Sequence, residues 1–179
     1  MPEIAPGRLL VAAPDLEDPN FQRSVVLVLA HTDEGTLGVA LNRTGELPVA
    51  EVVPELEGLA AEPASVFVGG PVQPDGVVAL AQVDEEVDGV GPVAPGLGVL
   101  DLDRETGFIP PEVQQLRLFA GHAGWDAGQL EDELAAGGWF VVDGEPGDAM
   151  TDDPEHLWER VLRRQGGVFS TATADPSTN

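Results

Sequence analysis

Two arginines near the start of the chain could bind a carboxylate or a phosphate. Arg23 and Arg43 flank a predicted β-hairpin whose turn centres near residues 33–34. Antiparallel pairing brings both arginines to the open end of this hairpin, beside Gln22 and Asn42. Guanidinium groups hold carboxylates and phosphates through paired, charge-assisted hydrogen bonds, so this end is predicted to bind an anionic ligand. The alternative is that both arginines pair with carboxylates of the chain itself.

A glycine-rich segment in the second half of the chain is expected to join a strand to a helix. It runs from Gly121 to Trp125 and includes Gly124. Backbone N–H groups at such a helix start could bind an anion, although Asp126 would occupy the same place. Gln129 follows Asp126 at the spacing of a capping box and belongs to the same turn. The alternative is architectural, with glycines that permit close packing and Trp125 in the core.

A second pair of glycines, Gly69 and Gly70, precedes Pro71. Neither glycine segment is a phosphate-binding P-loop, because the chain contains no Gly-Lys-Ser or Gly-Lys-Thr sequence. The hypothesis is that this pair and the open end of the hairpin lie at the binding surface for a small anionic ligand or a protein partner.

The three histidines, at positions 31, 122 and 156, are far apart in sequence. None has the spacing of a zinc motif and the chain has no cysteine, so no metal site and no cofactor are predicted. His31 lies near Asp33 and Glu34, and a general base there would make the chain an enzyme of unknown reaction. No Gly-x-Ser-x-Gly sequence occurs, so no hydrolase triad and no catalytic residue are assigned.

One acidic stretch superficially resembles a calcium-binding loop. Its carboxylates are Asp101, Asp103, Glu105 and Glu112. The turn glycine falls one place late, and Pro110-Pro111 disrupt the exit from the loop. The segment is therefore expected to be a solvated acidic loop.

The composition is strongly acidic. The 179 residues include 32 acidic and 8 basic side chains, a net charge of −24, and every basic residue is arginine. A GC-rich genome or a saline host would each account for this bias. Phosphate backbones and anionic membranes would be repelled, so neither direct nucleic-acid binding nor membrane binding is expected. No apolar run is long enough to span a membrane and no signal peptide is recognised, so a cytoplasmic protein is expected.

The elements that must position these residues are mostly strands. Apolar and β-branched runs predict them at 8–13, 24–30, 36–41, 65–68, 76–83, 97–102, 116–121 and 139–142. The stretch 85–96 is rich in glycine and proline and is expected to be an exposed loop. Because strands outnumber helices and do not alternate regularly with them, the pattern favours a mixed sheet with a few packed helices.

Three helices are predicted. The first covers 49–59 and is interrupted at Pro54, and the second begins at Asp126 and ends at 137–138. The third has Asp153 as N-cap, with Pro154 at its first position. Its buried stripe is predicted to consist of Leu157, Trp158, Val161 and Leu162. Residues 171–179 are expected to form a loosely packed tail of a single domain that spans 1–179.

Several segments together resemble the YqgE/AlgH family of bacterial proteins. They are PGRLLVAAPDLEDPNFQRSVVLVLAH, GVALNR, VFVGGPV, FAGHAGWDAGQLEDELAAGGW, LWERVLRRQGG and the terminal DPSTN, in that order along nearly the whole chain. His122 stands where the family usually has tyrosine, and Thr178 where it usually has leucine.

The resemblance implies an α+β fold in which a bifurcated mixed sheet curls into a barrel-like core with flanking helices. It implies no catalytic residues, and such chains are often labelled transcriptional regulators. The leading hypothesis is a non-enzymatic protein that acts by binding a protein or a small anionic ligand. The alternatives are a small-molecule enzyme that uses His31 or carboxylates, and a DNA-binding regulator, against which the acidic surface argues.

Overall fold

The structure is a computed structural model that describes residues 3–14, 16, 19, 21–85, 90–100 and 110–165. Its strands are β1 (Arg8–Ala12), β2 (Val25–Thr32), β3 (Gly35–Ala40), β4 (Phe67–Val68), β5 (Val72–Val83), β6 (Val90–Ala94), β7 (Leu97–Leu100), β8 (Val113–Asp126) and β9 (Trp139–Asp143). Its helices are α1 (Val49–Val52), α2 (Gln129–Ala135), α3 (Pro146–Ala149) and α4 (Leu157–Gln165), with 3₁₀ turns η1 (Pro54–Leu59) and η2 (Pro154–His156).

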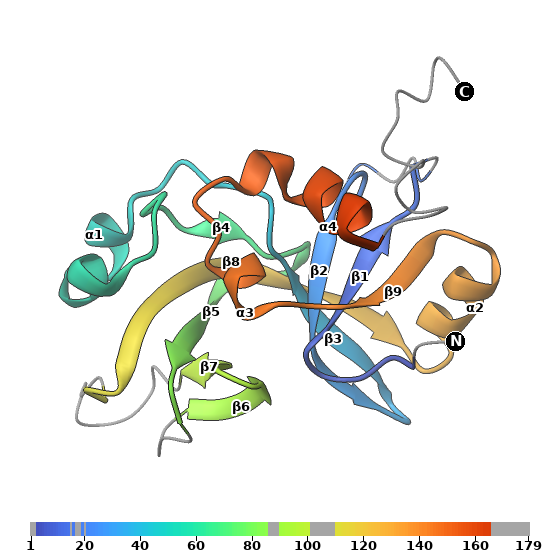
Figure 1. Ribbon diagram of the computed structural model, residues 1–179, viewed down its shortest axis with the longest axis horizontal. Helices are drawn as coiled ribbons and strands as arrows, with labels where there is room; N and C mark the ends of the chain where they lie inside the picture. Colours follow the sequence, from blue (N-terminus) through green and yellow to red (C-terminus); the bar gives the residue numbers. More distant parts are fainter. Residues whose placement is uncertain are drawn as a thin grey trace.

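The strands form one curled sheet. Its order is β6-β7-β5-β8-β3-β2-β1-β9, with antiparallel neighbours throughout, and β4 adds a short parallel pairing to β8. The curl returns β6 toward β2, so that Val93 and Leu97 share a core with Leu27 (Figure 1). The expected mixed sheet with a barrel-like core is confirmed as a half-barrel with a few flanking helices.

Residues 9–12 of β1, 25–28 of β2 and 38–40 of β3 are buried on both faces because helices cover each side. Leu9, Leu27 and Val39 face α4, which contributes the predicted stripe that includes Trp158. Residues of the opposite parity, such as Val26, face α2. Each large apolar side chain buried in this way contributes about 1.5–3 kcal/mol. None of the helices in the described part of the chain is long and apolar enough to span a membrane.

The long strand β8 changes the face that it presents at Gly121. Phe119 belongs to the core inside the half-barrel, whereas Ala123 and Trp125, at positions of the same parity, belong to the cluster beneath α2. Gly121 has φ +73, a conformation that side chains disfavour. The segment 121–125 is therefore part of a strand, and the prediction that it is a strand-to-helix turn is wrong.

The chain crosses β8 at this same glycine. Val68 of β4 and Val77 of β5 both pair with Ala120, so the link between them must pass from one side of β8 to the other. A Cβ atom at Gly69 or Gly70 would collide with the backbone of Gly121 or His122, respectively. These glycines thus permit two backbones to touch, which is the architectural alternative.

Two further predictions about secondary structure are wrong. The expected loop at 85–96 contains the strand β6, which turns tightly back into β7. The helix expected from Asp126 begins at Gln129 instead, with Gly128 as N-cap, because β8 continues through Asp126. The acidic residues at 101–105 and the terminal tail lie outside the described residues.

Three other predictions are confirmed. The hairpin forms with a two-residue turn between Thr32 and Gly35, and the first helix is interrupted at Pro54. The buried stripe of the last helix is as expected.

Asp153, however, makes no capping hydrogen bond, because η2 precedes the helix and the carboxylate accepts from His156 Nδ1 at 2.9 Å instead.

A buried arginine connects β8 to segments outside the sheet. The guanidinium of Arg117 donates to the carbonyl oxygens of Glu62, Ala149 and Thr151 at 2.7, 2.9 and 2.8 Å. It also lies 4.3 Å from the ring centre of Phe67. Burial lowers the pKa of Arg117 to about 10, so the side chain remains charged at neutral pH.

Candidate functional site

The open end of the hairpin carries a group of residues that we call the arginine platform: Gln22, Arg23, Asn42, Arg43 and Trp158. The structure brings these residues to one place, since all five line one hollow of about 380 Å³. The side chain of Asn42 extends the pairing of the strands beyond β2 and β3. Its Oδ1 accepts from the N–H of Val25 at 3.0 Å, and its Nδ2 donates to the carbonyl of Arg23 at 2.8 Å.

Arg43 holds the loop that precedes β2, which we call the platform loop. Its guanidinium donates to Ser24 Oγ at 3.1 Å and to the carbonyls of Pro19 and Gln22 at 3.2 and 3.1 Å. Ser24 is fully buried, so this contact satisfies a hydroxyl that water cannot reach. Arg43 therefore shapes the platform, and we do not expect it to meet a ligand first.

Arg23 is displayed differently. It is exposed, its φ is +57, and its guanidinium lies 5.2 Å from the ring centre of Trp158. A positive φ in a residue other than glycine costs about 1–3 kcal/mol and persists only where neighbours impose it. Asn42 and Arg43 supply that constraint. Among the described residues, no carboxylate forms an ion pair with Arg23.

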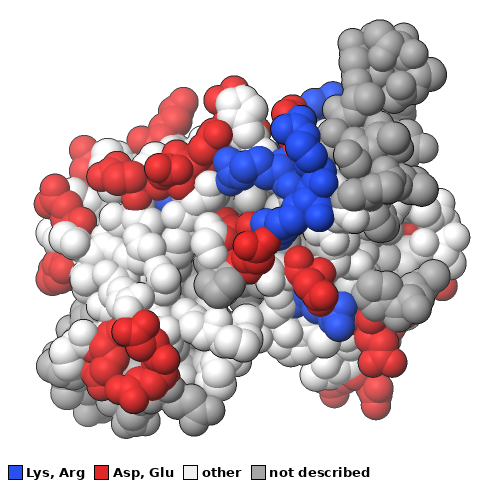
Figure 2. All heavy atoms as spheres, in the orientation of Figure 1, with Lys and Arg blue, Asp and Glu red and all other residues white. Residues whose placement is uncertain are grey.

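The surroundings of the platform combine both signs of charge. In Figure 2 the largest group of arginine side chains lies over α4, while acidic side chains are spread over much of the rest of this face. Glu155 and Glu159 line the platform hollow together with Arg23. On α4, Arg160 and Arg164 are already paired with acidic neighbours. An incoming anion would therefore meet Arg23 first and the two glutamates beside it.

An aromatic cluster lies next to the platform and includes Phe21, which directly precedes Gln22 in the chain. The rings of Phe21, Trp125 and Trp139 pack together with centres 5.6–5.7 Å apart. Glu133 Oε1 accepts from the indole N–H of both tryptophans, at 3.1 and 3.0 Å. Gln129 donates to Glu133 Oε2 at 3.1 Å and accepts from the N–H of Asp126 at 3.0 Å.

Within the described residues, the hydrogen bonds of Gln129 and Trp125 therefore hold α2 against the end of β8. Sequence reasoning missed Glu133 and Phe21, because four acidic residues lie between the two tryptophans and no local signal distinguishes Glu133 from the others. It also missed Arg117, which an arginine within the apolar run Leu-Arg-Leu-Phe could have indicated.

The remaining candidate residues do not join the platform. His31 lies within β2, where Nδ1 is 2.7 Å from Thr36 Oγ1 and Nε2 is 3.9 Å from Glu131. Gly69, Gly70 and Gly121 lie at the crossing over β8. Within the described residues, no group of three or more histidines or acids is arranged to hold a metal ion.

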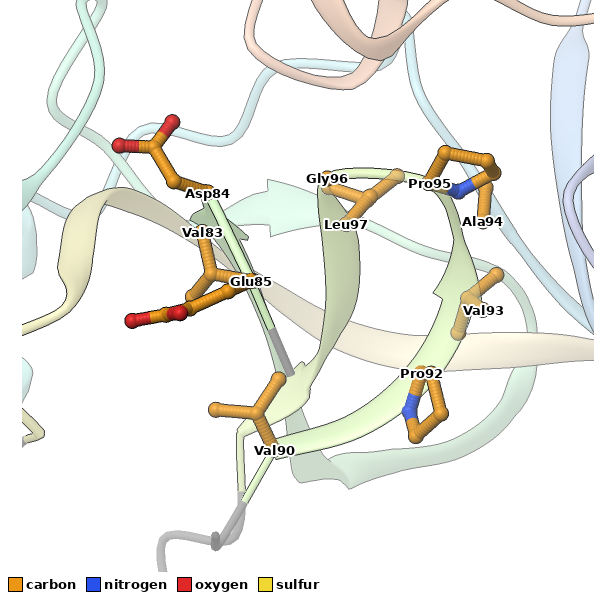
Figure 3. Close-up of a pocket in the computed structure, with 10 residues that line it drawn as sticks. All are labelled: Val83, Asp84, Glu85, Val90, Pro92, Val93, Ala94, Pro95, Gly96 and Leu97. Carbon is orange, nitrogen blue, oxygen red and sulfur yellow. The ribbon is translucent and has the colours of Figure 1, made fainter. Parts of the chain in front are cut away.

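Two other hollows are of less use as sites. The one in Figure 3, of about 470 Å³, is walled by the end of β5 and the β6–β7 hairpin. Residues 86–89, which connect two of its walls, lie outside the described residues. A smaller hollow of about 140 Å³ adjoins α3, where Asp148 and Glu145 are already paired with Arg164.

Comparison with known proteins decides the family. A family profile described as AlgH-like matches residues 9–170. The chain belongs to the AlgH-like family. It is 47% identical over 182 residues to UPF0301 protein SCO2948 of Streptomyces coelicolor, a match that covers 97% of this chain and 94% of that protein. A UPF0301 protein of Thermobifida fusca is 46% identical, with the same coverage.

Two solved structures share the fold of this chain. The crystal structure of DIP2367 from Corynebacterium diphtheriae matches with a TM-score of 0.90 and 34% identity, over 97% of this chain and 94% of that one. The solution structure of AlgH from Pseudomonas aeruginosa matches with a TM-score of 0.69 and 28% identity, over 98% of each chain. The names of these proteins state no biochemical activity.

Proposed function

We propose that this protein acts by binding, and that the arginine platform recognises an anionic group, a carboxylate or a phosphate, on its ligand. The observation that carries the proposal is the state of Arg23. An exposed guanidinium is held in a strained backbone conformation over Trp158, without an ion pair in the described part of a chain of net charge −24.

The contacts around Arg23 support recognition more than stability. An exposed arginine that served only stability would be expected to pair with one of the abundant carboxylates, a contact worth about 0–1 kcal/mol. Here the neighbouring polar groups are used to fix the backbone of Arg23 instead, through Asn42 and Arg43. Such preorganisation reduces the entropy that is lost when a ligand binds.

The two glutamates in the hollow narrow the ligand class. Glu155 and Glu159 would repel a small, highly charged anion, whereas they could accept hydrogen bonds from ammonium or hydroxyl groups. We therefore expect the anionic group to belong to a molecule that also carries donors. Phosphoserine is a simple probe of this kind, and inorganic phosphate is the corresponding anion without donors.

The test is an NMR titration of the ¹⁵N-labelled protein with phosphoserine and with inorganic phosphate, at constant ionic strength. Phosphoserine is expected to bind with a Kd on the order of 1 mM, about −4 kcal/mol, and more tightly than phosphate. Shifts should concentrate at Gln22, Arg23 and the Trp158 indole.

Matched variants make the titration decisive. Arg23→Gln is expected to weaken phosphoserine binding about tenfold, whereas Arg163→Gln, an exposed arginine of α4 outside the hollow, should leave it within about twofold. The proposal would be abandoned if both variants behaved alike, or if shifts were spread evenly over the surface.

A further inference from the structure

Another hollow, on a different part of the sheet, is lined by apolar side chains and acids rather than by arginines. It encloses about 450 Å³ beside β3 and β8. Its walls include Leu37 and Val72, which are 47% and 38% exposed although both are large and apolar. We call it the acid-rimmed hollow, and it shares no lining residue with the arginine platform.

Glycine keeps the floor of this hollow open. Gly124 pairs with Leu37 across β3 and β8, and Val72 pairs with the preceding outward residue, His122. A Cβ atom at Gly124 would lie 3.6 Å from Val72 Cγ2 and 3.8 Å from Leu37 Cδ2. A methyl-sized group at this position would therefore be in ordinary van der Waals contact with both apolar walls.

The rim of the hollow is acidic. Glu34 and Asp126 both line it and both are exposed. Among the described residues neither carboxylate is paired with a cation, and no arginine is part of the lining. These two charges would repel the surface of a second copy of this chain, which is itself acidic, and would attract a basic one.

We propose that the acid-rimmed hollow docks a segment of another protein in which an apolar side chain is flanked by lysine or arginine. The apolar side chain would enter between Leu37 and Val72, over Gly124, where it would bury surface that water now covers. The flanking cations would face Glu34 and Asp126, which gives the charge complementarity that selects this partner over an acidic one.

The test uses defined peptides and fluorescence anisotropy. The probe is a labelled peptide of sequence KKLFKK, compared with KKSSKK, which keeps the charge, and EELFEE, which keeps the apolar centre. KKLFKK is expected to bind about tenfold more tightly than either control. Equal binding of KKLFKK and KKSSKK would mean non-specific attraction to an acidic protein and would overturn the proposal.

Two valines of the same strand provide a matched pair of variants. Val72→Ser is expected to weaken KKLFKK binding about fivefold or more, whereas Val77→Ser, at a valine that is 42% exposed but outside the hollow, should change it less than twofold. Similarly, Glu34→Gln should weaken binding about twofold and reduce its salt dependence, and Glu55→Gln on η1 should not.

A measurement on the unaltered protein removes dependence on the folding of any variant. Methyl NMR resonances of Leu37 and Val72 are expected to shift when KKLFKK is added, with those of Val77 unchanged. Light scattering over a concentration series reports on the other possible occupant. Dimerisation that Val72→Ser abolishes would assign the hollow to a second copy of the chain and would refute the docking of a basic segment.

Discussion

The arginine platform and the acid-rimmed hollow differ in what organises them. At the platform, polar side chains fix a loop, and a single exposed arginine is the result. At the hollow, strand pairing places two apolar side chains beside a glycine, and no polar contact is needed to hold them apart. An exposed side chain can therefore be positioned either by hydrogen bonds within a loop or by strand register in a sheet.

The two regions are also physically connected. Phe21 is separated from Arg23 by one residue and stacks on Trp125, whose centre lies 5.7 Å away and which lines the hollow. Glu133 fixes that tryptophan through its indole N–H. Changes at the connection should therefore affect both regions, and changes within one region should spare the other.

The largest loss of stability is expected from a substitution at Gly121, which disrupts the sheet geometry on which the acid-rimmed hollow depends. Gly121→Ala would place a side chain at φ +73 and against the carbonyl oxygen of Gly70, so we expect a loss of about 3 kcal/mol or more in the free energy of unfolding. Urea denaturation measures this loss. The control is Gly58→Ala, where a Cβ atom meets nothing within 4 Å and the change should stay within about 1 kcal/mol.

The next largest loss of stability is expected from a substitution at Glu133, which holds the aromatic cluster between the arginine platform and the acid-rimmed hollow. Glu133→Ala leaves two largely buried indole N–H groups without an acceptor, which should lower the free energy of unfolding by about 2–3 kcal/mol. It should also broaden NMR signals at both Arg23 and Leu37. Asp132→Ala on the same helix should change stability by less than about 0.5 kcal/mol, and an equal effect there would show that the carboxylate of Glu133 is unimportant.

A smaller loss of stability is expected from a substitution at Arg43, which should affect the arginine platform and not the acid-rimmed hollow. Arg43→Ala removes three hydrogen bonds from the platform loop and should cost about 1–2 kcal/mol of stability. Phosphoserine binding should be lost while KKLFKK binding remains, as measured by the titrations above. If both were lost together, the two regions would form a single site and the comparison would fail.

The smallest effect is a pH dependence confined to the platform side. A hydrogen bond and the negative charge of Asp153 raise the pKa of His156 above its ordinary value of 6.5. The stabilising contact is therefore fully present below pH 6.5 and is lost as pH rises through the pKa of the folded protein. An NMR titration of the imidazole should show this raised pKa, and Asp153→Asn should return it toward 6.5.

The predictable parts of the fold are those in which local signals and packing agree. The β2–β3 hairpin follows from apolar runs around a polar turn, and α4 from its stripe and its arginines. The segment 121–125 was misread because its glycines resemble those of a turn, whereas they permit a strand to change faces and another backbone to cross it. Crossings of this kind depend on partners distant in sequence, which no local pattern records.

The two candidate sites also differ in how much of each could be predicted from local signals. Hairpin register was enough to predict that Arg23, Asn42 and Arg43 lie together. The part played by Trp158 was not predictable, because it reaches Arg23 across more than a hundred residues of chain. The acid-rimmed hollow could not be predicted either, since Leu37 and Val72 are brought together only when β3 and β5 both pair with β8.

The position of β8 in three apolar clusters has a consequence for how the protein unfolds. Residues of β8 before Gly121 belong to two apolar clusters and those after Gly121 to the cluster beneath α2, so all three clusters lose residues if β8 detaches. Backbone amides on either side of Gly121 should therefore exchange with deuterium at one common slow rate, set by complete unfolding. Limited proteolysis is therefore expected to yield no stable fragment that contains only one half of β8.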